Sequence, residues 1–192
     1  MKFSFATLLA VLLLAANVCF GKDQIDYSYV DVLYLDTELE PADGDGFAVR
    51  GSYGFNENVH FLGEITFTDI SAFGIDTDFN TWRLGAGFHG GFSERADFIA
   101  EVTYESAEVD AGFSSVDDSG FGVRLGARGL VTEKFEVNGY IRHVDIDDID
   151  TMFGAGVLYH FNDVGALLFE YETGDDLTNI YIGGRISFSP GF

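Results

Sequence analysis

The sequence predicts an all-β fold, an antiparallel up-and-down transmembrane β-barrel of about ten strands, and three observations lead to this prediction. Apolar residues alternate with small or charged residues along ten segments, which places the two sets on opposite faces of strands. The connections between these segments alternate between short turns and acidic loops. Aromatic residues lie at both ends of the apolar set, with aliphatic residues between them.

Residues 1–21 have the features of a secretory signal peptide and are not expected to belong to the fold. Lys2 gives a positive start, and the apolar run that follows is shorter than the roughly 20 residues of a membrane helix. Cleavage is expected between Gly21 and Lys22. A lipoprotein site at Cys19 is the alternative, and Val18 before it disfavours this. Residues 22–192 would then form one outer-membrane β-barrel domain without a disulfide, since Cys19 is the only cysteine.

The charge of the chain limits its partners. Without the leader, 9 basic residues stand against 32 acidic ones, a net charge of −23. Such a chain repels nucleic acid and bare anionic bilayers. No apolar run after the leader is long enough for a transmembrane helix. The two remaining classes are an outer-membrane barrel and a soluble secreted β-protein.

The ten predicted strands are each close to the 9–11 residues that a tilted strand needs to cross a bilayer, and their even number is typical of bacterial barrels. Their ranges are 25–35, 46–56, 59–69, 79–89, 96–107, 119–130, 135–145, 152–161, 164–173 and 179–188. In the first range, Tyr27, Tyr29 and Leu33 share the parity of Asp31, which predicts a β-bulge there.

The connections fall into two alternating classes. The short ones are 56–58, 89–95, 131–134 and 162–163, and the acidic ones are 36–45, 69–78, 108–118, 145–150 and 174–176. Alternate connections of an up-and-down barrel lie at the same end. One rim is therefore predicted to be tight and the other strongly negative, as in barrels with short periplasmic turns and longer extracellular loops.

The polar strand face has the composition of an enclosed space. It carries six arginines, six glutamates and no lysine: Arg50, Arg83, Arg124, Arg128, Arg142 and Arg185 with Glu64, Glu101, Glu105, Glu136, Glu170 and Glu172. A buried charge without a partner is costly, and arginine binds carboxylates in a bidentate fork. We therefore predict luminal ion pairs, with Arg124 and Arg128 facing Glu101 and Glu105 across neighbouring strands.

The apolar face has the layers of a bilayer cross-section. One aromatic girdle comprises Phe55, Phe88, Phe98, Phe135, Phe161 and Phe188, and the other comprises Phe47, Phe67, Trp82, Tyr104, Phe121, Phe153 and Tyr171. Between them lie Val49, Ile65, Leu84, Val102, Val123, Leu125, Val137, Val157 and Leu167. This arrangement predicts that the apolar face meets lipid.

The last strand resembles the C-terminal assembly signal of Gram-negative outer-membrane proteins. Its residues are Tyr181, Gly183, Ile186 and Phe188, and because the chain continues to Phe192, either phenylalanine could close the signal. With the stretches Trp82–Gly87 and Arg95–Asp97, the chain resembles a small outer-membrane β-barrel of the OmpA/OmpX-like superfamily. The resemblance implies outer-membrane localisation, and it implies no particular activity.

Catalytic, cofactor-binding and metal sites are not predicted. His143 and Asp145 could form a base–orienter pair, but His143 shares the lipid-facing parity of Ile141. The segments Asp43–Gly46 and Asp145–Asp150 look like fragments of calcium loops without the closing ligands.

We therefore expect a non-enzymatic, monomeric barrel with a charge-paired, closed lumen and acidic extracellular loops, serving a structural or surface-interaction role. The expected partners are outer-membrane lipid, the barrel-assembly machinery and weakly held divalent cations at the loops. The alternatives are a narrow porin-like pore and a secreted soluble ligand-binding barrel.

Overall fold

The computed structural model describes residues 25–39, 42–72, 75–110, 115–146, 149–175 and 177–188, apart from the side chains of residues 71–76, 149 and 150. Ten strands lie in this part of the chain. They are β1 (Tyr29–Leu39), β2 (Ala42–Gly54), β3 (Val59–Ala72), β4 (Ile75–Ser93), β5 (Ala96–Asp110), β6 (Ser115–Leu130), β7 (Phe135–Ile146), β8 (Ile149–His160), β9 (Gly165–Thr173) and β10 (Leu177–Ser187). The signal cleavage residues Gly21 and Lys22, and the terminal Phe192, lie outside the described residues.

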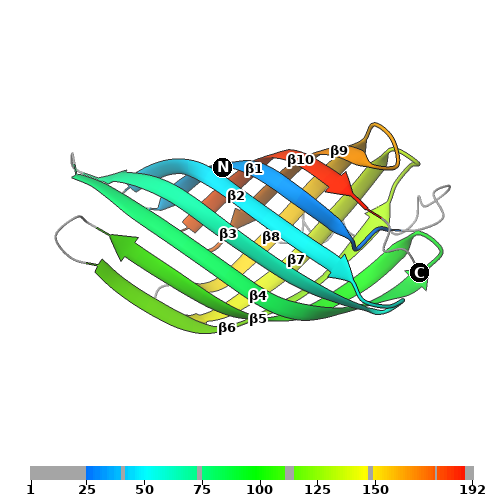
Figure 1. Cartoon of the computed structure of the whole chain (residues 1–192), viewed down its shortest axis with the longest axis horizontal. Coiled ribbons are helices and arrows are strands. Elements are labelled where there is room, and N and C mark those ends of the chain that lie inside the picture. Colours follow the sequence, from blue (N-terminus) through cyan, green and yellow to red (C-terminus); the bar gives the residue numbers. More distant parts are fainter. Residues whose placement is uncertain are drawn as a thin grey trace.

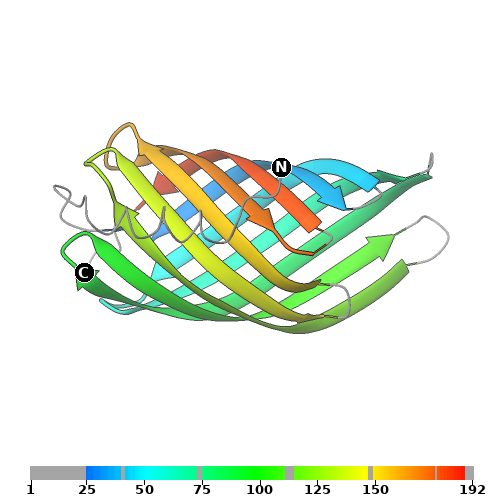
Figure 2. The ribbon, with the colours of Figure 1, turned by 180° about the vertical axis from the view of Figure 1, so that it is seen from behind.

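The strands form one closed barrel in which every strand pairs with its neighbours in the chain and β1 pairs with β10. All pairs are antiparallel, and the strands are tilted against the long axis of the barrel (Figures 1 and 2). This confirms the predicted fold class and the predicted strand number. Among the described residues, no helix is long and apolar enough to cross a membrane.

The two ends of the barrel differ in how well the sequence marks them. At the short-turn end, the Asn56 and Asn162 side chains each accept two backbone N–H bonds of 2.8–2.9 Å. Such turns stop a strand at a defined residue. At the other end, the acidic end, pairing continues into the predicted loops, so that β3 runs to Ala72 and β6 begins at Ser115. Acidic residues there alternate and pair like the rest of the strand. β4 is 19 residues long because it extends at both ends, to Ile75 in the acidic loop and to Ser93 in the predicted turn 89–95.

The predicted bulge in the first strand is wrong. β1 keeps an unbroken register with both β2 and β10. Tyr29, Asp31 and Leu33 all point into the barrel, while Val30 and Val32 face outward. No bulge is needed to place apolar and charged residues of β1 on one face, because the lumen accepts apolar side chains beside charged ones. The register shifts lie instead between Gly91 and Ser93 and between His143 and Ile146.

The outer face carries the apolar set. All residues of the two girdles and the aliphatic band are exposed on this face except Phe153 and Val137, which are half-buried. The inner face holds the charged set together with a buried apolar cluster of Leu33, Leu35, Ala48, Leu158, Ala166, Leu168 and Tyr181. The barrel is thus apolar outside, and its interior is filled by ionic and apolar side chains together.

Candidate functional site: the charged lumen

The structure places all twelve predicted luminal charges on the inner face. The six glutamates and four of the arginines are buried. The side chains of Arg124 and Arg142 keep 13% and 11% of their exposure. Their position follows from strand parity, because each alternates with a lipid-facing residue of the outer set.

Eight side chains at mid-lumen form one connected network, which we call the luminal belt. It comprises Arg50, Glu64, Arg83, Glu105, Tyr140, Arg142, Glu170 and Glu172.

In the first half of the belt, two arginines meet one carboxylate. Arg50 donates through Nε to Glu64 and through Nη2 to Glu170 Oε1, 3.0 Å away. Arg83 Nη2 donates to Glu64 Oε2 at 3.0 Å. Since Arg50 lies on β2 and Glu170 on β9, with β1 and β10 between them, this ion pair crosses the lumen instead of running along the wall.

In the second half, a tyrosine joins the carboxylates of β9. Tyr140 Oη is 2.8 Å from Glu172 Oε2 and 3.2 Å from Glu170 Oε1. Arg142 Nη1 donates to Glu105 Oε2 at 2.9 Å, and its Nη2 lies 3.6 Å from Glu172 Oε1. The belt therefore ends at Glu105, which lies opposite its other end, Arg83, in the β4–β5 register.

Three further pairs lie in the lumen outside the belt. Arg124 binds Glu101 at 2.8 Å, and Arg185 binds Asp31 through two bonds of 2.7 and 2.9 Å. Arg128 pairs with Glu136 of β7 at 2.6 Å and not with Glu105 as the sequence suggested. The register explains the difference, because Glu101 is directly opposite Arg124 whereas Glu105 is opposite Gly120.

Sequence reasoning missed Asp31 and a cluster of histidines in the lumen. His60, His89 and His160 are all buried, and each neighbours an outward-facing phenylalanine, which was the parity signal that could have placed them. His60 Nε2 lies 3.0 Å from Glu101 Oε1, and its Nδ1 lies 3.0 Å from Nδ1 of His89. His160 Nε2 lies 3.2 Å from Glu136 Oε2.

Buried tyrosines stack against the luminal arginines. The guanidinium of Arg185 lies 3.5 Å from the ring centroid of Tyr29, and that of Arg128 lies 4.7 Å from the ring of Tyr27. Such contacts stabilise a cation that is out of water. Burial raises the pKa of the Tyr27 phenol, which keeps its proton and donates to Asp97 at 3.0 Å.

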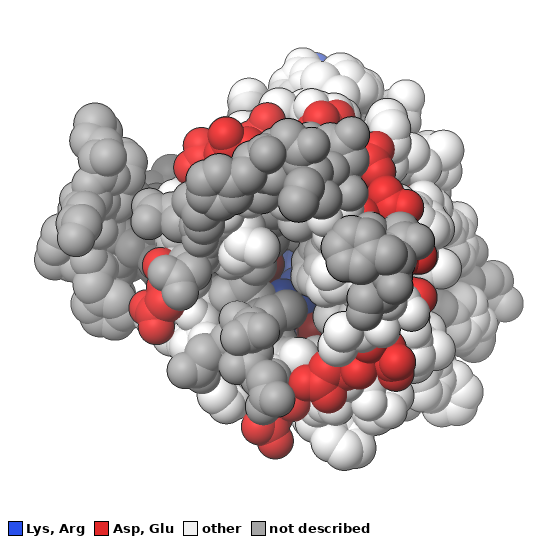
Figure 3. Space-filling view, turned by 90° about the vertical axis from the view of Figure 1, so that its left-hand side faces the viewer, with Lys and Arg blue, Asp and Glu red and all other residues white. Residues whose placement is uncertain are grey.

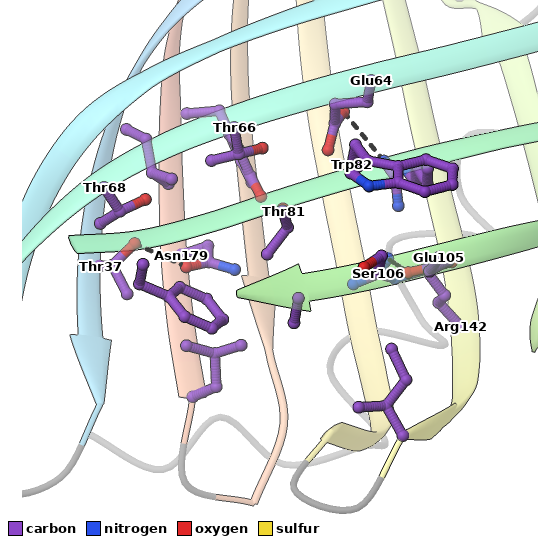
Figure 4. Close-up of a pocket in the computed structure, with 17 residues that line it drawn as sticks. Thr37, Glu64, Thr66, Thr68, Thr81, Trp82, Glu105, Ser106, Arg142 and Asn179 are labelled. Atoms are coloured by element: carbon purple, nitrogen blue, oxygen red, sulfur yellow. Dashed lines mark hydrogen bonds and ion pairs between the residues drawn. The ribbon is translucent and has the colours of Figure 1, made fainter. Parts of the chain in front are cut away.

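Above the belt, the lumen widens into a vestibule at the acidic end. Figure 4 shows Thr66, Thr68 and Thr81 around one space with Thr37 and Asn179, which share a 2.9 Å hydrogen bond. The belt residues Glu64, Arg83, Glu105 and Arg142 also line it. Its volume is about 50 Å³, enough for a few water molecules and well below the roughly 300–1,000 Å³ of ligand pockets.

The rim around the vestibule is acidic. Figure 3 shows Asp and Glu side chains around the opening, with Arg or Lys atoms visible deep inside it. Five aspartates lie in one row across β1–β5, each opposite the next in register: Asp36, Asp45, Asp69, Asp78 and Asp110. All five are exposed on the outer face. Like charges placed opposite each other repel, so this row favours a hydrated surface.

The remaining candidate residues lie apart from the lumen. His143 and Asp145 are exposed on the outer face of β7, and His143 Nδ1 lies 3.1 Å from Thr151 Oγ1. Of the assembly-signal residues, Tyr181 points inward, whereas Ile186 and Phe188 face outward. In the described part of the chain, no group of three or more His, Cys, Asp or Glu residues is arranged to hold a metal ion.

Comparison with known proteins agrees with this architecture. Residues 6–161 match the family described as the outer membrane protein beta-barrel domain. No curated protein matches the chain in sequence.

Solved structures are similar at low identity. The KdgM porin has a TM-score of 0.50 at 10% identity, covering 83% of this chain and 99% of that one. The translocator domain of the autotransporter NalP from Neisseria meningitidis has a TM-score of 0.49 at 9% identity, covering 95% and 94%. Ail, the attachment invasion locus protein of Yersinia pestis, has a TM-score of 0.39 at 14% identity, covering 84% and 99%. At these identities the likeness concerns the fold alone.

Proposed function

Since the chain belongs to the outer membrane protein beta-barrel family, we propose that it is a non-enzymatic barrel with a closed lumen, serving a structural or surface-interaction role. The luminal belt is the observation that carries this proposal. Its ion pairs link β2 with β9, and β7 with β5 and β9, so they span the interior. A solute would have to break several buried pairs to pass, at a cost of several kcal/mol each.

The apolar cluster adds to this closure. Leu33, Leu158 and Leu168 are at most 2% exposed and point into the same interior as the belt. A water-filled pore keeps its wall polar, whereas here leucines pack where water would have to flow. Barrels of about eight strands have an interior that side chains alone can fill, and ten strands with large arginine, tyrosine and leucine side chains extend this principle.

A narrow porin-like pore is the second candidate, and the vestibule favours it. The vestibule is lined by Arg83 and Arg142 of the belt, so a small rearrangement of these arginines would extend this water-accessible space into the lumen. Because the rim is acidic, such a pore would prefer cations. Closure remains the better proposal because both arginines are held by carboxylates, Glu64 and Glu105.

The soluble secreted barrel, the third alternative, does not fit the outer face. Exposed residues such as Phe47, Leu84 and Phe121 would present a continuous apolar surface to water.

In the proposed orientation, the short turns face the periplasm and the acidic rim faces outward. Lipid would surround a monomer, the assembly machinery would read Phe188 or Phe192, and the rim would hold divalent cations weakly. His143, on the lipid-facing side, supports no enzymatic role.

The test combines location, folding and conductance. We expect the protein in the outer-membrane fraction, with its unheated form migrating differently from the boiled form because a closed hydrogen-bonded barrel resists unfolding. In planar bilayers at neutral pH the purified protein should form no steady channels. Recovery from the periplasm with a single gel position would refute the membrane barrel. Large, steady channels would refute closure and support the pore.

A further inference from the structure

Residues 25–28, which precede β1, are tied into the short-turn end of the lumen by backbone and side-chain contacts. The Tyr27 carbonyl accepts a hydrogen bond of 2.7 Å from Ser52 Oγ. Ser28 accepts from the Gly54 N–H through Oγ at 3.0 Å and from the Phe188 N–H through its carbonyl at 2.9 Å. The segment is thus fixed between β2 and the end of β10, with Tyr27 only 7% exposed.

The Tyr27 side chain reaches the other side of the lumen. Its ring stacks on His89 of β4 with centroids 3.5 Å apart and planes 10° apart. Its hydroxyl donates to Asp97 of β5, and Arg128 of β6 lies over the ring. Tyr27 therefore fills the interior between β2 and β6 at the short-turn end, below the luminal belt.

His89 is held in turn by His60 through a contact that depends on protonation. Their Nδ1 atoms are 3.0 Å apart, a distance at which one nitrogen must carry a proton and the other must accept it. His60 Nε2 faces the Glu101 carboxylate and so carries a proton. The hydrogen bonds are satisfied when His89 donates to His60 and His60 donates to Glu101, with both rings neutral.

We infer that residues 25–28 form a stopper for the short-turn end of the lumen, latched by the His60–His89 pair and released when both imidazoles are protonated. When both facing Nδ1 atoms carry a proton, neither can accept a hydrogen bond, so the bond between the two rings is lost. Two positively charged donors then face each other. The surroundings already hold Arg124 and Arg128 from β6, against Glu101 and Asp97 from β5 and Glu136 from β7. Separation of the rings moves His89 away from Tyr27 and removes its stacking partner.

Release would leave the belt in place, because no belt residue contacts Tyr27, His60 or His89 through the hydrogen bonds and ion pairs of the described residues. The stopper therefore opens only the lower lumen, and its behaviour is separate from the proposed closure of the barrel. A conductance measurement tests closure, whereas the mobility of residue 25 tests the stopper.

The experiment attaches a nitroxide spin label to Ile25→Cys, with Cys19→Ser so that the label has one site, and records spectra in lipid bilayers from pH 7.5 to pH 3. We expect an immobilised label at pH 7.5 that becomes mobile in acid. Tyr27→Ala should give the mobile spectrum at every pH and defines the released state. His143→Gln, on the outer face, is the matched control and should keep the response of the parent.

His60→Gln provides the decisive comparison. Glutamine can still exchange a hydrogen bond with His89 but takes up no proton, so the label should stay immobilised across the pH range while the Tyr27–His89 stack remains. If His60→Gln fails to give the heat-sensitive gel shift of a folded barrel, His60→Asn, which also takes up no proton and keeps His89, replaces it. An immobilised label in the parent down to pH 3, or the same acid transition in the glutamine variant, would overturn the proposal.

Discussion

Asp31 illustrates how single residues fill this barrel. It is fully buried and accepts hydrogen bonds from Nε and Nη2 of Arg185, whose guanidinium itself lies against Tyr29. A carboxylate in this position is stable only with its partner, because the desolvation cost of the lone charge is large. The same holds for Glu136, which is 1% exposed and shared by Arg128 and His160.

Removal of Arg185 should therefore be strongly destabilising. We expect Arg185→Ala to lower the free energy of unfolding by about 3–5 kcal/mol, since Asp31 is left buried without a partner. Urea unfolding in lipid vesicles measures this. The double variant Asp31→Asn with Arg185→Met should regain part of the loss, and Lys134→Ala, at an exposed turn, should match the parent. A loss below about 0.5 kcal/mol would show that the pair is not buried.

At this scale, the sequence allowed the arginines and glutamates to be placed, but of their partners only Glu101 for Arg124 was predicted. The parity of each residue assigns it to a face, so all twelve luminal charges were predicted to face inward. Which charges form ion pairs depends on the strand register and on contacts that cross the lumen, such as the one between Arg50 and Glu170. No local sequence pattern contains this information. The sequence did not predict the luminal histidines or Asp31, because only the balanced arginines and glutamates indicated an enclosed face.

At the scale of the strand, alternation fixes which face meets lipid. Leu84 and Val123 are 61% and 43% exposed near the middle of the outer face. Leu84→Arg or Val123→Arg should destabilise the inserted barrel by roughly 2–4 kcal/mol, the cost of a cation at the bilayer midplane. Reversible folding into bilayers measures it. Thr66→Arg, in the vestibule, should instead disturb luminal packing. Unchanged stability of the Leu84 and Val123 variants would reverse the assignment of faces.

Strand β10 must also approach β1 closely. A Cβ at Gly183 would lie 2.1 Å from the Val32 carbonyl oxygen and 2.8 Å from the Leu33 Cα, both backbone atoms that cannot move alone. Gly183→Ala should therefore weaken the strand pair that closes the barrel and reduce the yield of the heat-sensitive folded form. Gly51→Ala is the matched control, because a Cβ there meets nothing within 4 Å. Equal yields from both variants would contradict this account.

The strand boundaries were predictable at one end only. Asn56 and Asn162 mark the short turns through side-chain bonds to the backbone, which is local chemistry. At the acidic end, Asp45, Asp69 and Asp78 lie in paired strands that the sequence suggested were loops. The charge and composition of these segments resemble those of loops, but the inward and outward alternation of the flanking strands continues through them.

At the scale of the whole molecule, the barrel differs from a soluble protein in the location of its polar groups. Ionic side chains lie with apolar ones in its interior, and its apolar outer surface faces lipid. The number of strands and the face exposed to lipid could be predicted from the alternation of apolar and polar residues and from the two aromatic girdles, because both patterns repeat along the entire chain. The sequence did not show which side chains meet across the lumen, because the luminal belt combines side chains from β2, β5, β7 and β9. The outer-membrane location follows from the family, and the biological role of the acidic rim remains a proposal.

Planar-bilayer conductance of Arg50→Ala with Arg142→Ala, compared with the parent at neutral pH, tests the central claim most directly. The double variant removes two large side chains of the luminal belt and leaves Glu170, Glu105 and Glu172 without their arginine partners. The account predicts that the parent does not conduct, whereas the variant is less stable and passes cations. Large, steady channels from the parent itself, or a double variant as closed and as stable as the parent, would contradict a lumen closed by its ion pairs.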